Sequence, residues 1–167
     1  KVITAVRRSG KSILAYQLLK DKQFAYANFD DELLANIAAE DLNKIIEVFY
    51  QIYGDFKYIF FDEIQNVSGW ELFINRLQRQ GFNLVITGSN AKLLSKELAT
   101  HLTGRHTALE LLPFSFKEFL NYNNINPDIN LLTTKDTALI KIKLEEYLKL
   151  GGFPDIVKEP FNQRMYI

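Results

Sequence analysis

Residues 5–14, AVRRSGKSIL, contain side chains that could bind phosphate. Gly10, Lys11 and Ser12 match the end of the phosphate-loop pattern G-x-x-x-x-G-K-[ST], although Ala5 stands where that pattern has its first glycine. The lysine would supply positive charge to the outer phosphates of a nucleotide, and the serine hydroxyl could hold the magnesium ion that bridges them. A side chain at Gly10 would collide with the phosphate. Ala5 adds only one methyl group, so we expect a nucleotide site despite it.

A second chemical signal is KYIFFDEIQN, residues 57–66. Four apolar or aromatic residues are typical of a buried strand, and Asp62 and Glu63 follow at its carboxyl end, where parallel sheets bind ligands. Asp62 can hold the magnesium, and Glu63 can act as general base on an attacking water. Two acidic residues can also mark the plain exit of a strand into solvent, so the interpretation depends on their pairing with Lys11 and Ser12.

A third apolar run ends in the residues Thr87-Gly88-Ser89-Asn90. If this strand lies between the other two, Ser89 or Asn90 would lie beside the terminal phosphate and the attacking water. The pattern does not choose between these two residues, and a plain turn is the alternative. GTPases would show an Asp-x-x-Gly loop and an Asn-Lys-x-Asp base reader, and neither is found in the sequence.

Short apolar runs alternate with segments of helical spacing, which favours βαβ units around a parallel sheet. The expected strands are 2–6, 24–29, 58–61, 84–87 and 108–112, and the expected helices are 11–20, 42–53, 70–80, 93–102, 114–122 and 136–150. Capping boxes at Ser68 and Ser115 predict two of the helix starts.

The strand, loop and helix around Gly10 would bring backbone N–H groups and a helix N-terminus to one point, where a phosphate fits. We therefore expect the nucleotide to contact Arg8, Ser9, Gly10, Lys11, Ser12 and Ile13. Arg8 can equally be a solvated loop arginine.

The character of the chain changes at Pro113. We expect a nucleotide-binding core in residues 1–113 and a small helical appendage in residues 114–167. Lys1 stands almost at the start of the first expected strand, so we expect the chain to be a fragment of a longer protein.

Composition limits the classes of function. The 167 residues include 20 basic and 20 acidic side chains and no cysteine, which excludes disulfides and thiolate metal sites and gives no support for nucleic-acid binding. The two histidines argue against a metalloenzyme built on imidazole ligands. No apolar run approaches the roughly 20 residues that span a bilayer, and no leader opens the chain, so we expect a cytoplasmic protein without membrane contact.

The ordered set RRSGKS, YANFDDE, YIFFDEIQNVSGWE, VITGSN, LTGRH, LLPFSFKEFL and YLKLGGFPDIV resembles the AAA-type (AAA+ superfamily) P-loop ATPase domain of prokaryotic ATPases that carry a C-terminal DUF4143 region. The resemblance extends from the first residues to about Lys158. It implies a five-stranded α/β P-loop core of the additional-strand type, with the sensor strand between the Walker A and Walker B strands, followed by a small helical lid. It also implies ATP as the nucleotide, with Mg²⁺.

By this resemblance the motif residues take named roles. The Walker A residues are Gly10, Lys11 and Ser12, the Walker B pair is Asp62 and Glu63, and the first sensor is Ser89 or Asn90. Arg105 in LTGRH matches a Gly-Arg element and could be an arginine finger, a phosphate sensor or an ordinary surface arginine.

Two functions are consistent with these residues. The first is an ATPase that hydrolyses Mg-ATP to drive a conformational change, with Glu63 as base. The second is a nucleotide-dependent switch with little intrinsic hydrolysis, because completing the site could require an arginine from another subunit of a homo-oligomer or from a further region of the longer protein. The macromolecular partner cannot be read from the residues.

Overall fold

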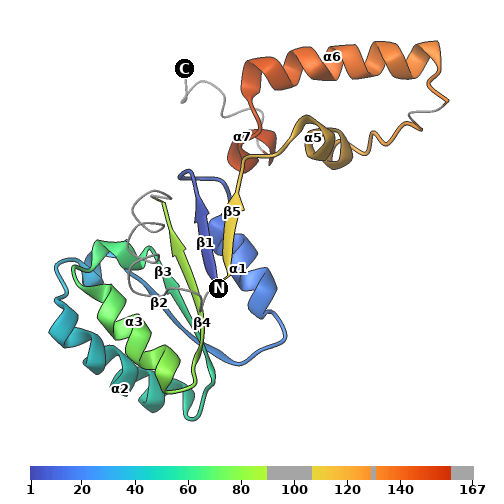
Figure 1. Ribbon diagram of the computed structural model, residues 1–167. Helices are drawn as coiled ribbons and strands as arrows, with labels where there is room; N and C mark the ends of the chain where they lie inside the picture. Colours follow the sequence, from blue (N-terminus) through green and yellow to red (C-terminus); the bar gives the residue numbers. More distant parts are fainter. Residues whose placement is uncertain (90–106, 129–130, 159–167) are drawn as a thin grey trace. The chain divides into compact units, whose positions relative to one another are not determined.

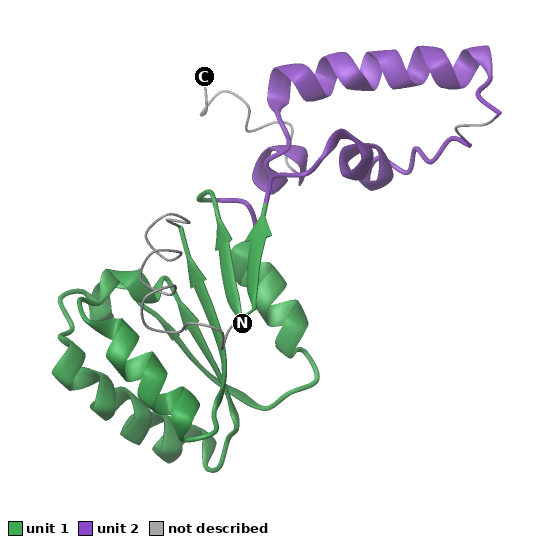
Figure 2. Cartoon of the chain, in the orientation of Figure 1, with its two compact units in different colours: residues 1–7, 11–111 green, residues 8–10, 112–167 purple. Residues whose placement is uncertain are grey.

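The computed structural model describes residues 1–89, 107–128 and 131–158. Internal contacts divide the chain into two compact units, which are described separately (Figure 2). The first unit comprises Lys1–Arg7 and Lys11–Leu111, and the second comprises Arg8–Gly10 and Leu112–Ile167.

A five-stranded parallel sheet is the frame of the first unit (Figure 1). Its strands are β1 (Val2–Ala5), β2 (Phe24–Asn28), β3 (Tyr58–Asp62), β4 (Asn83–Gly88) and β5 (Ala108–Leu111). Their order is β2-β3-β4-β1-β5, so β4 lies between β1 and β3, as the resemblance implied. The predicted α/β fold, with its additional strand and its C-terminal helices, is confirmed.

Helices connect the strands of this sheet. They are α1 (Lys11–Leu19), α2 (Leu42–Tyr53) and α3 (Trp70–Arg79), with short 3₁₀ turns η1 (Glu32–Leu34), η2 (Ala39–Asp41) and η3 (Ile64–Asn66). The predicted helix 42–53 is confirmed at both ends, and those at 11–20 and 70–80 each end one residue earlier than expected. The helix expected at 93–102 lies outside the described residues.

Two apolar clusters fill the faces of the sheet. Neighbouring strand residues point to opposite faces, so Phe60 packs with Ala15 and Leu19 of α1, while Phe61 packs with the residues of α2 and α3. Trp70 is among the largest fully buried side chains and belongs to the same cluster as Phe61. Strands with both faces covered explain the continuous apolar runs in the sequence.

The capping box predicted at Ser68 is wrong. Gly69 is the N-cap of α3, with φ of 76°, and no side chain forms a capping hydrogen bond there. A left-handed backbone at this position suits glycine and places the helix start after Gly69, so Ser68 does not take the N-cap position.

The second unit contains α5 (Phe116–Tyr122), α6 (Thr134–Leu150) and α7 (Pro154–Lys158). The capping box predicted at Ser115 is confirmed, because its hydroxyl accepts from the N–H of Glu118 and the Glu118 side chain bonds back to Ser115. A second box, Thr133 with Asp136, begins α6. Phe119 is buried and packs against Phe116 and Tyr147.

Gly152 has a specific packing role in the second unit. The N–H of Phe114 donates to the carbonyl of Gly152 over 2.7 Å. A Cβ atom at residue 152 would lie 2.0 Å from the carbonyl oxygen of Phe114, so a larger residue cannot fit without movement of the backbone. Gly152 therefore permits the segment after α6 to lie against the segment before α5.

Candidate functional site

The predicted phosphate loop joins β1 to α1. Gly10 has a φ of 91°, in the region that favours glycine, and α1 begins at the next residue, Lys11. Ala5 is the last residue of β1 and is not among the residues with positive φ. Its strand backbone does not need a glycine, which is the physical reason that alanine is tolerated there.

Lys11 reaches from the start of α1 to the end of β3. Its Nζ lies 3.2 Å from Oε1 of Glu63, and only 5% of the Lys11 side chain and 16% of the Glu63 side chain are exposed. Ser12 is half-buried in the first turn of the helix, whereas Ile13 is exposed. The hydroxyl of Ser9 is buried and has no hydrogen-bond partner among the described residues.

Asp62 and Thr87 form a buried polar pair at the ends of β3 and β4. The pairing of Phe61 with Ile86 places the residues that follow them side by side. The Thr87 hydroxyl donates to Oδ1 of Asp62 and accepts from the N–H of Glu63, the latter over 3.2 Å. Thr87 therefore fixes the Asp62 carboxylate and the backbone at Glu63 together.

Glu63 has an unusual backbone conformation, and its carboxylate has three partners. Its φ of 52° is left-handed, which for a residue other than glycine costs of order 1–3 kcal/mol. Besides the ion pair with Lys11, its Oε2 accepts from the N–H of Ser89 over 2.9 Å and from Nε2 of Gln65 over 2.6 Å. These contacts hold the carboxylate at the carboxyl edge of the sheet.

Opposing influences set the charge state of Glu63. Burial by itself raises the pKa of its carboxyl group, but the hydrogen bond from Gln65, the charge and hydrogen bond of Lys11 and a hydrogen bond from the Ser89 side chain together outweigh burial. The pKa is therefore lowered from its usual value, and Glu63 is an ionised hydrogen-bond acceptor at neutral pH.

The structure brings Lys11, Asp62, Glu63 and Ser89 to one edge of the sheet. Asn90 and Arg105 lie outside the described residues, so the choice between Ser89 and Asn90 and the role of Arg105 stay predictions. Arg8 lies in the loop before Gly10, has a left-handed backbone with φ of 68°, and is exposed.

Sequence reasoning missed Thr87 and Gln65 as members of the site. Thr87 directly follows the apolar run Leu84-Val85-Ile86 within β4, and that contrast was the available signal. Gln65 follows Glu63 by two residues, and the NH₂ of its amide must face the carboxylate to donate to it. The Oε1 atom then points elsewhere, and it is buried without a hydrogen-bond partner among the described residues.

Metal-binding clusters and membrane-spanning helices are both absent from the described residues. Within 1–89, 107–128 and 131–158, no group of three or more His, Asp or Glu side chains is placed to hold a metal ion. In the same ranges, no helix has both the length and the apolar character needed to cross a membrane.

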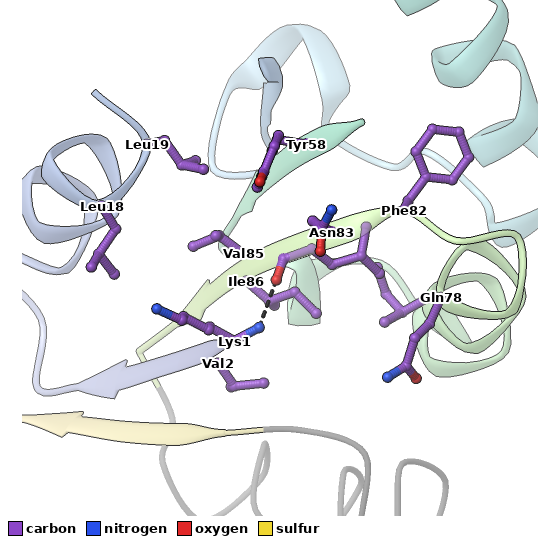
Figure 3. Close-up of a pocket in the computed structure, with 12 residues that line it drawn as sticks. Lys1, Val2, Leu18, Leu19, Tyr58, Gln78, Phe82, Asn83, Val85 and Ile86 are labelled. Carbon is purple, nitrogen blue, oxygen red and sulfur yellow. Dashed lines mark hydrogen bonds between the residues drawn. The ribbon is translucent and has the colours of Figure 1, made fainter. Parts of the chain in front are cut away.

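A separate pocket lies at the amino ends of the strands (Figure 3). It has a volume of about 270 Å³, and Val2, Tyr58 and Asn83 from the starts of β1, β3 and β4 line it with Leu18 of α1. Because the strands are parallel, this pocket and the cluster around Lys11 are at opposite ends of the sheet.

Comparisons with known proteins agree with this geometry. A family model described as "AAA domain" matches residues 1–120. An uncharacterized protein of Methanocaldococcus jannaschii, MJ1544, is 47% identical over 160 residues, which cover 93% of this chain and 36% of that protein. An uncharacterized protein of Haemophilus influenzae is 39% identical over 176 residues, covering 98% of this chain and 42% of its own length. The chain thus spans less than half the length of these relatives.

Among solved structures, the Walker-type ATPase PABY2304 of Pyrococcus abyssi is similar with a TM-score of 0.59 and 16% identity. The match covers 94% of this chain and 60% of that chain. At this identity the likeness concerns the fold alone.

Proposed function

This chain belongs to the AAA domain family, and from that premise we propose that it binds Mg-ATP and hydrolyses it. The observation that carries the proposal is the convergence of Lys11, from the phosphate loop, and Glu63, from the end of β3, in one buried ion pair. A buried lysine and a half-buried glutamate from separate motifs need a reason to lie together. Binding a polyphosphate beside an attacking water supplies that reason.

Each residue has a proposed task. The backbone at Gly10 and the ammonium group of Lys11 would bind the phosphates at the start of α1. The hydroxyl of Ser12 and the carboxylate of Asp62 would hold magnesium, for which oxygen donors are suited. The hydroxyl of Ser9, which is buried and has no hydrogen-bond partner in the described part of the chain, is a further donor on the same loop. Magnesium, when bound, neutralises charge on the phosphates.

Glu63 is the proposed general base. Its lowered pKa keeps the carboxylate ionised at neutral pH, and an ionised carboxylate has a lone pair that can accept a proton from water. In this structure Oε1 of Glu63, the oxygen that would accept the proton, forms an ion pair with Lys11. A phosphate that attracts Lys11 would therefore free Glu63 for catalysis, and Gln65 and Ser89 would still position it.

The Lys11–Glu63 ion pair also favours a second candidate function, a nucleotide-dependent switch with little hydrolysis. If the lysine stays on the glutamate after ATP binds, the base is blocked until another group displaces it. An arginine from another subunit, or Arg105 of this chain, would be such a group. We also propose that the protein forms a homo-oligomer, that its helical lid moves on nucleotide turnover, and that the longer protein carries a C-terminal DUF4143 region.

Nucleotide binding can be tested by calorimetric titration of the chain with Mg-ATP. Lys11→Ala should reduce the affinity at least about tenfold, because it removes the buried cation of the site. Lys20→Ala, which removes an exposed lysine just after α1, is the matched control and should bind as the unaltered chain does. Equal affinity in both variants would refute the assignment of the phosphate loop.

A further inference from the structure

A groove of about 630 Å³ lies in the first unit and shares no lining residue with the cluster around Lys11. Tyr26, Ala27 and Asn28, three consecutive residues of β2, all line it. Consecutive strand side chains point to opposite faces, so one hollow can meet all three only at the edge of the strand. The other walls are the η1 segment and one face of α2.

The edge of β2 at this groove is free of strand pairing within the described residues. β2 is the terminal strand of the sheet and pairs with β3 along its other side. An unpaired strand edge presents a row of backbone N–H and C=O groups that another extended chain can bind. The groove therefore offers main-chain hydrogen bonds along one wall.

Apolar side chains are exposed along the remaining walls. Val48 and Ile52, one helical turn apart on α2, are 45% and 67% exposed, and Leu33 of η1 is 87% exposed. All three line the same groove. A contiguous apolar surface of this kind is typical of an interaction site.

The charges around the groove identify the chemistry of its partner. Although the whole chain is neutral, residues 30–48 contain six acidic side chains and one lysine. Lys44 is paired with Asp41 over 2.8 Å, and Arg7 is paired with Asp30 over 3.1 Å. Asp31 and Asp41 line the groove itself, and the other four acidic side chains lie on the same stretch of chain beside it, so the surroundings of the groove remain acidic. They would repel a phosphate, and they would also repel the same face of a second copy in a two-fold contact.

We propose that this groove binds an extended segment of another protein in which apolar side chains alternate with lysine or arginine. The segment adds to the free edge of β2 as a further strand, its apolar side chains contact Val48, Ile52 and Leu33, and its cations meet the acidic rim. The groove shares no lining residue with the proposed nucleotide site, although its residue Asn28 pairs with Asp62 in the sheet.

The probe for the test is a short synthetic peptide in which lysine and valine alternate, compared with one in which glutamate and valine alternate. We expect the basic peptide to bind the full chain at least about tenfold more tightly than the acidic one, measured by fluorescence anisotropy. When the basic peptide binds, the backbone amide NMR signals of the chain that shift should be those of β2 and α2. Equal binding of the two peptides, no binding, or shifts elsewhere would overturn the proposal.

Two charge-matched variants make the test specific. Ile52→Glu places a carboxylate inside the groove, whereas Leu72→Glu places one on α3 at a residue that is 69% exposed and does not line the groove. Both add one negative charge, so general attraction of a basic peptide changes equally. Ile52→Glu should weaken binding about tenfold relative to Leu72→Glu, and equal affinities would contradict the proposal.

The oligomeric state completes the test. Sedimentation of the unaltered chain and of Ile52→Glu should show no self-association that depends on the groove. A dimer that is present in the unaltered chain and absent in Ile52→Glu would overturn the proposal and assign the groove to a second copy.

Discussion

Carboxylates form hydrogen bonds in both units, but their surroundings differ. In the first unit, Asp62 is buried and Glu63 is half-buried. Lys11 forms an ion pair with Glu63, and Thr87 bonds to both acidic residues. In the second unit, Glu118 is exposed and its side chain bonds to Ser115, three residues away. Buried groups depend on each other, so the loss of one leaves another without a partner, whereas an exposed cap acts on one helix end.

This difference has a consequence for function. The buried cluster holds its charged atoms in fixed positions, which chemistry requires, and its members come from separate strands and a helix. The helices of the second unit begin at local contacts, and no residue of α6 is buried. Changes in the first unit should therefore alter activity more than folding, and changes in the second should alter folding first.

The largest expected effect on the second unit comes from Gly152→Ala. The new Cβ would meet the Phe114 carbonyl oxygen at 2.0 Å, so the backbone must move, at a cost of about 3 kcal/mol. Amide hydrogen exchange should show lost protection in α6 and α7 and unchanged protection in the sheet. Unchanged protection of α6 and α7 would show that this close approach has no structural importance.

The next effect is on activity and comes from Gln65→Leu. The variant removes the amide that donates to Oε2 of Glu63, so we expect kcat for ATP hydrolysis to fall roughly tenfold while the affinity for Mg-ATP is retained. Gln51→Leu, at an exposed position of α2, is the control and should leave kcat unchanged. Loss of ATP affinity in Gln65→Leu would mean that the residue supports the fold of the site, not the base.

The capping box of α5 should make a smaller contribution that depends on pH. The hydrogen bonds from Ser115 lower the pKa of Glu118, so their stabilisation is complete above the ordinary glutamate pKa and is lost as pH falls through the lowered value. Helical chemical shifts of α5 should weaken between about pH 5 and pH 3. Ser115→Ala should weaken the helix by about 1 kcal/mol at neutral pH and reduce this pH response. An unchanged pH response in that variant would contradict the assignment.

The smallest effect is expected for Ala5→Gly. Glycine in β1 should reduce the free energy of unfolding by roughly 0.5–1 kcal/mol, because a glycine loses more conformational freedom on folding than an alanine does. Affinity for Mg-ATP should stay equal or improve, since Ala5 precedes the left-handed turn at Gly10. A marked loss of affinity would show that the loop has been misread.

The sequence predicts most of the fold because the signals for its elements are local. Continuous apolar runs predict β1 and β3, and helical spacing predicts α2 to the residue. The capping pattern occurs at both Ser68 and Ser115, yet only Ser115 caps a helix, because Gly69 takes a left-handed backbone and becomes the N-cap itself. That outcome depends on tertiary context.

The motifs predicted that Lys11, Asp62 and Glu63 lie together, and the structure brings them to one edge of the sheet. Thr87 and Gln65 were missed because their contacts depend on the register between β3 and β4 and on the turn after β3. The groove at β2 depends on which strand ends the sheet, and nothing local in the sequence determines the strand order. The sequence therefore predicts the elements and their motif residues, whereas contacts that depend on how the elements pair require the structure.

The most direct test of the central claim is phosphate release from ATP in the presence of magnesium, measured for the unaltered chain and for Glu63→Gln. Glu47→Gln, an exposed carboxylate on α2, is the matched control. The account predicts turnover in the unaltered chain and the control, and a loss of at least about a hundredfold in Glu63→Gln with Mg-ATP binding retained. Full turnover in Glu63→Gln would contradict the role of Glu63 as base, and tight binding without turnover in the unaltered chain would favour the switch.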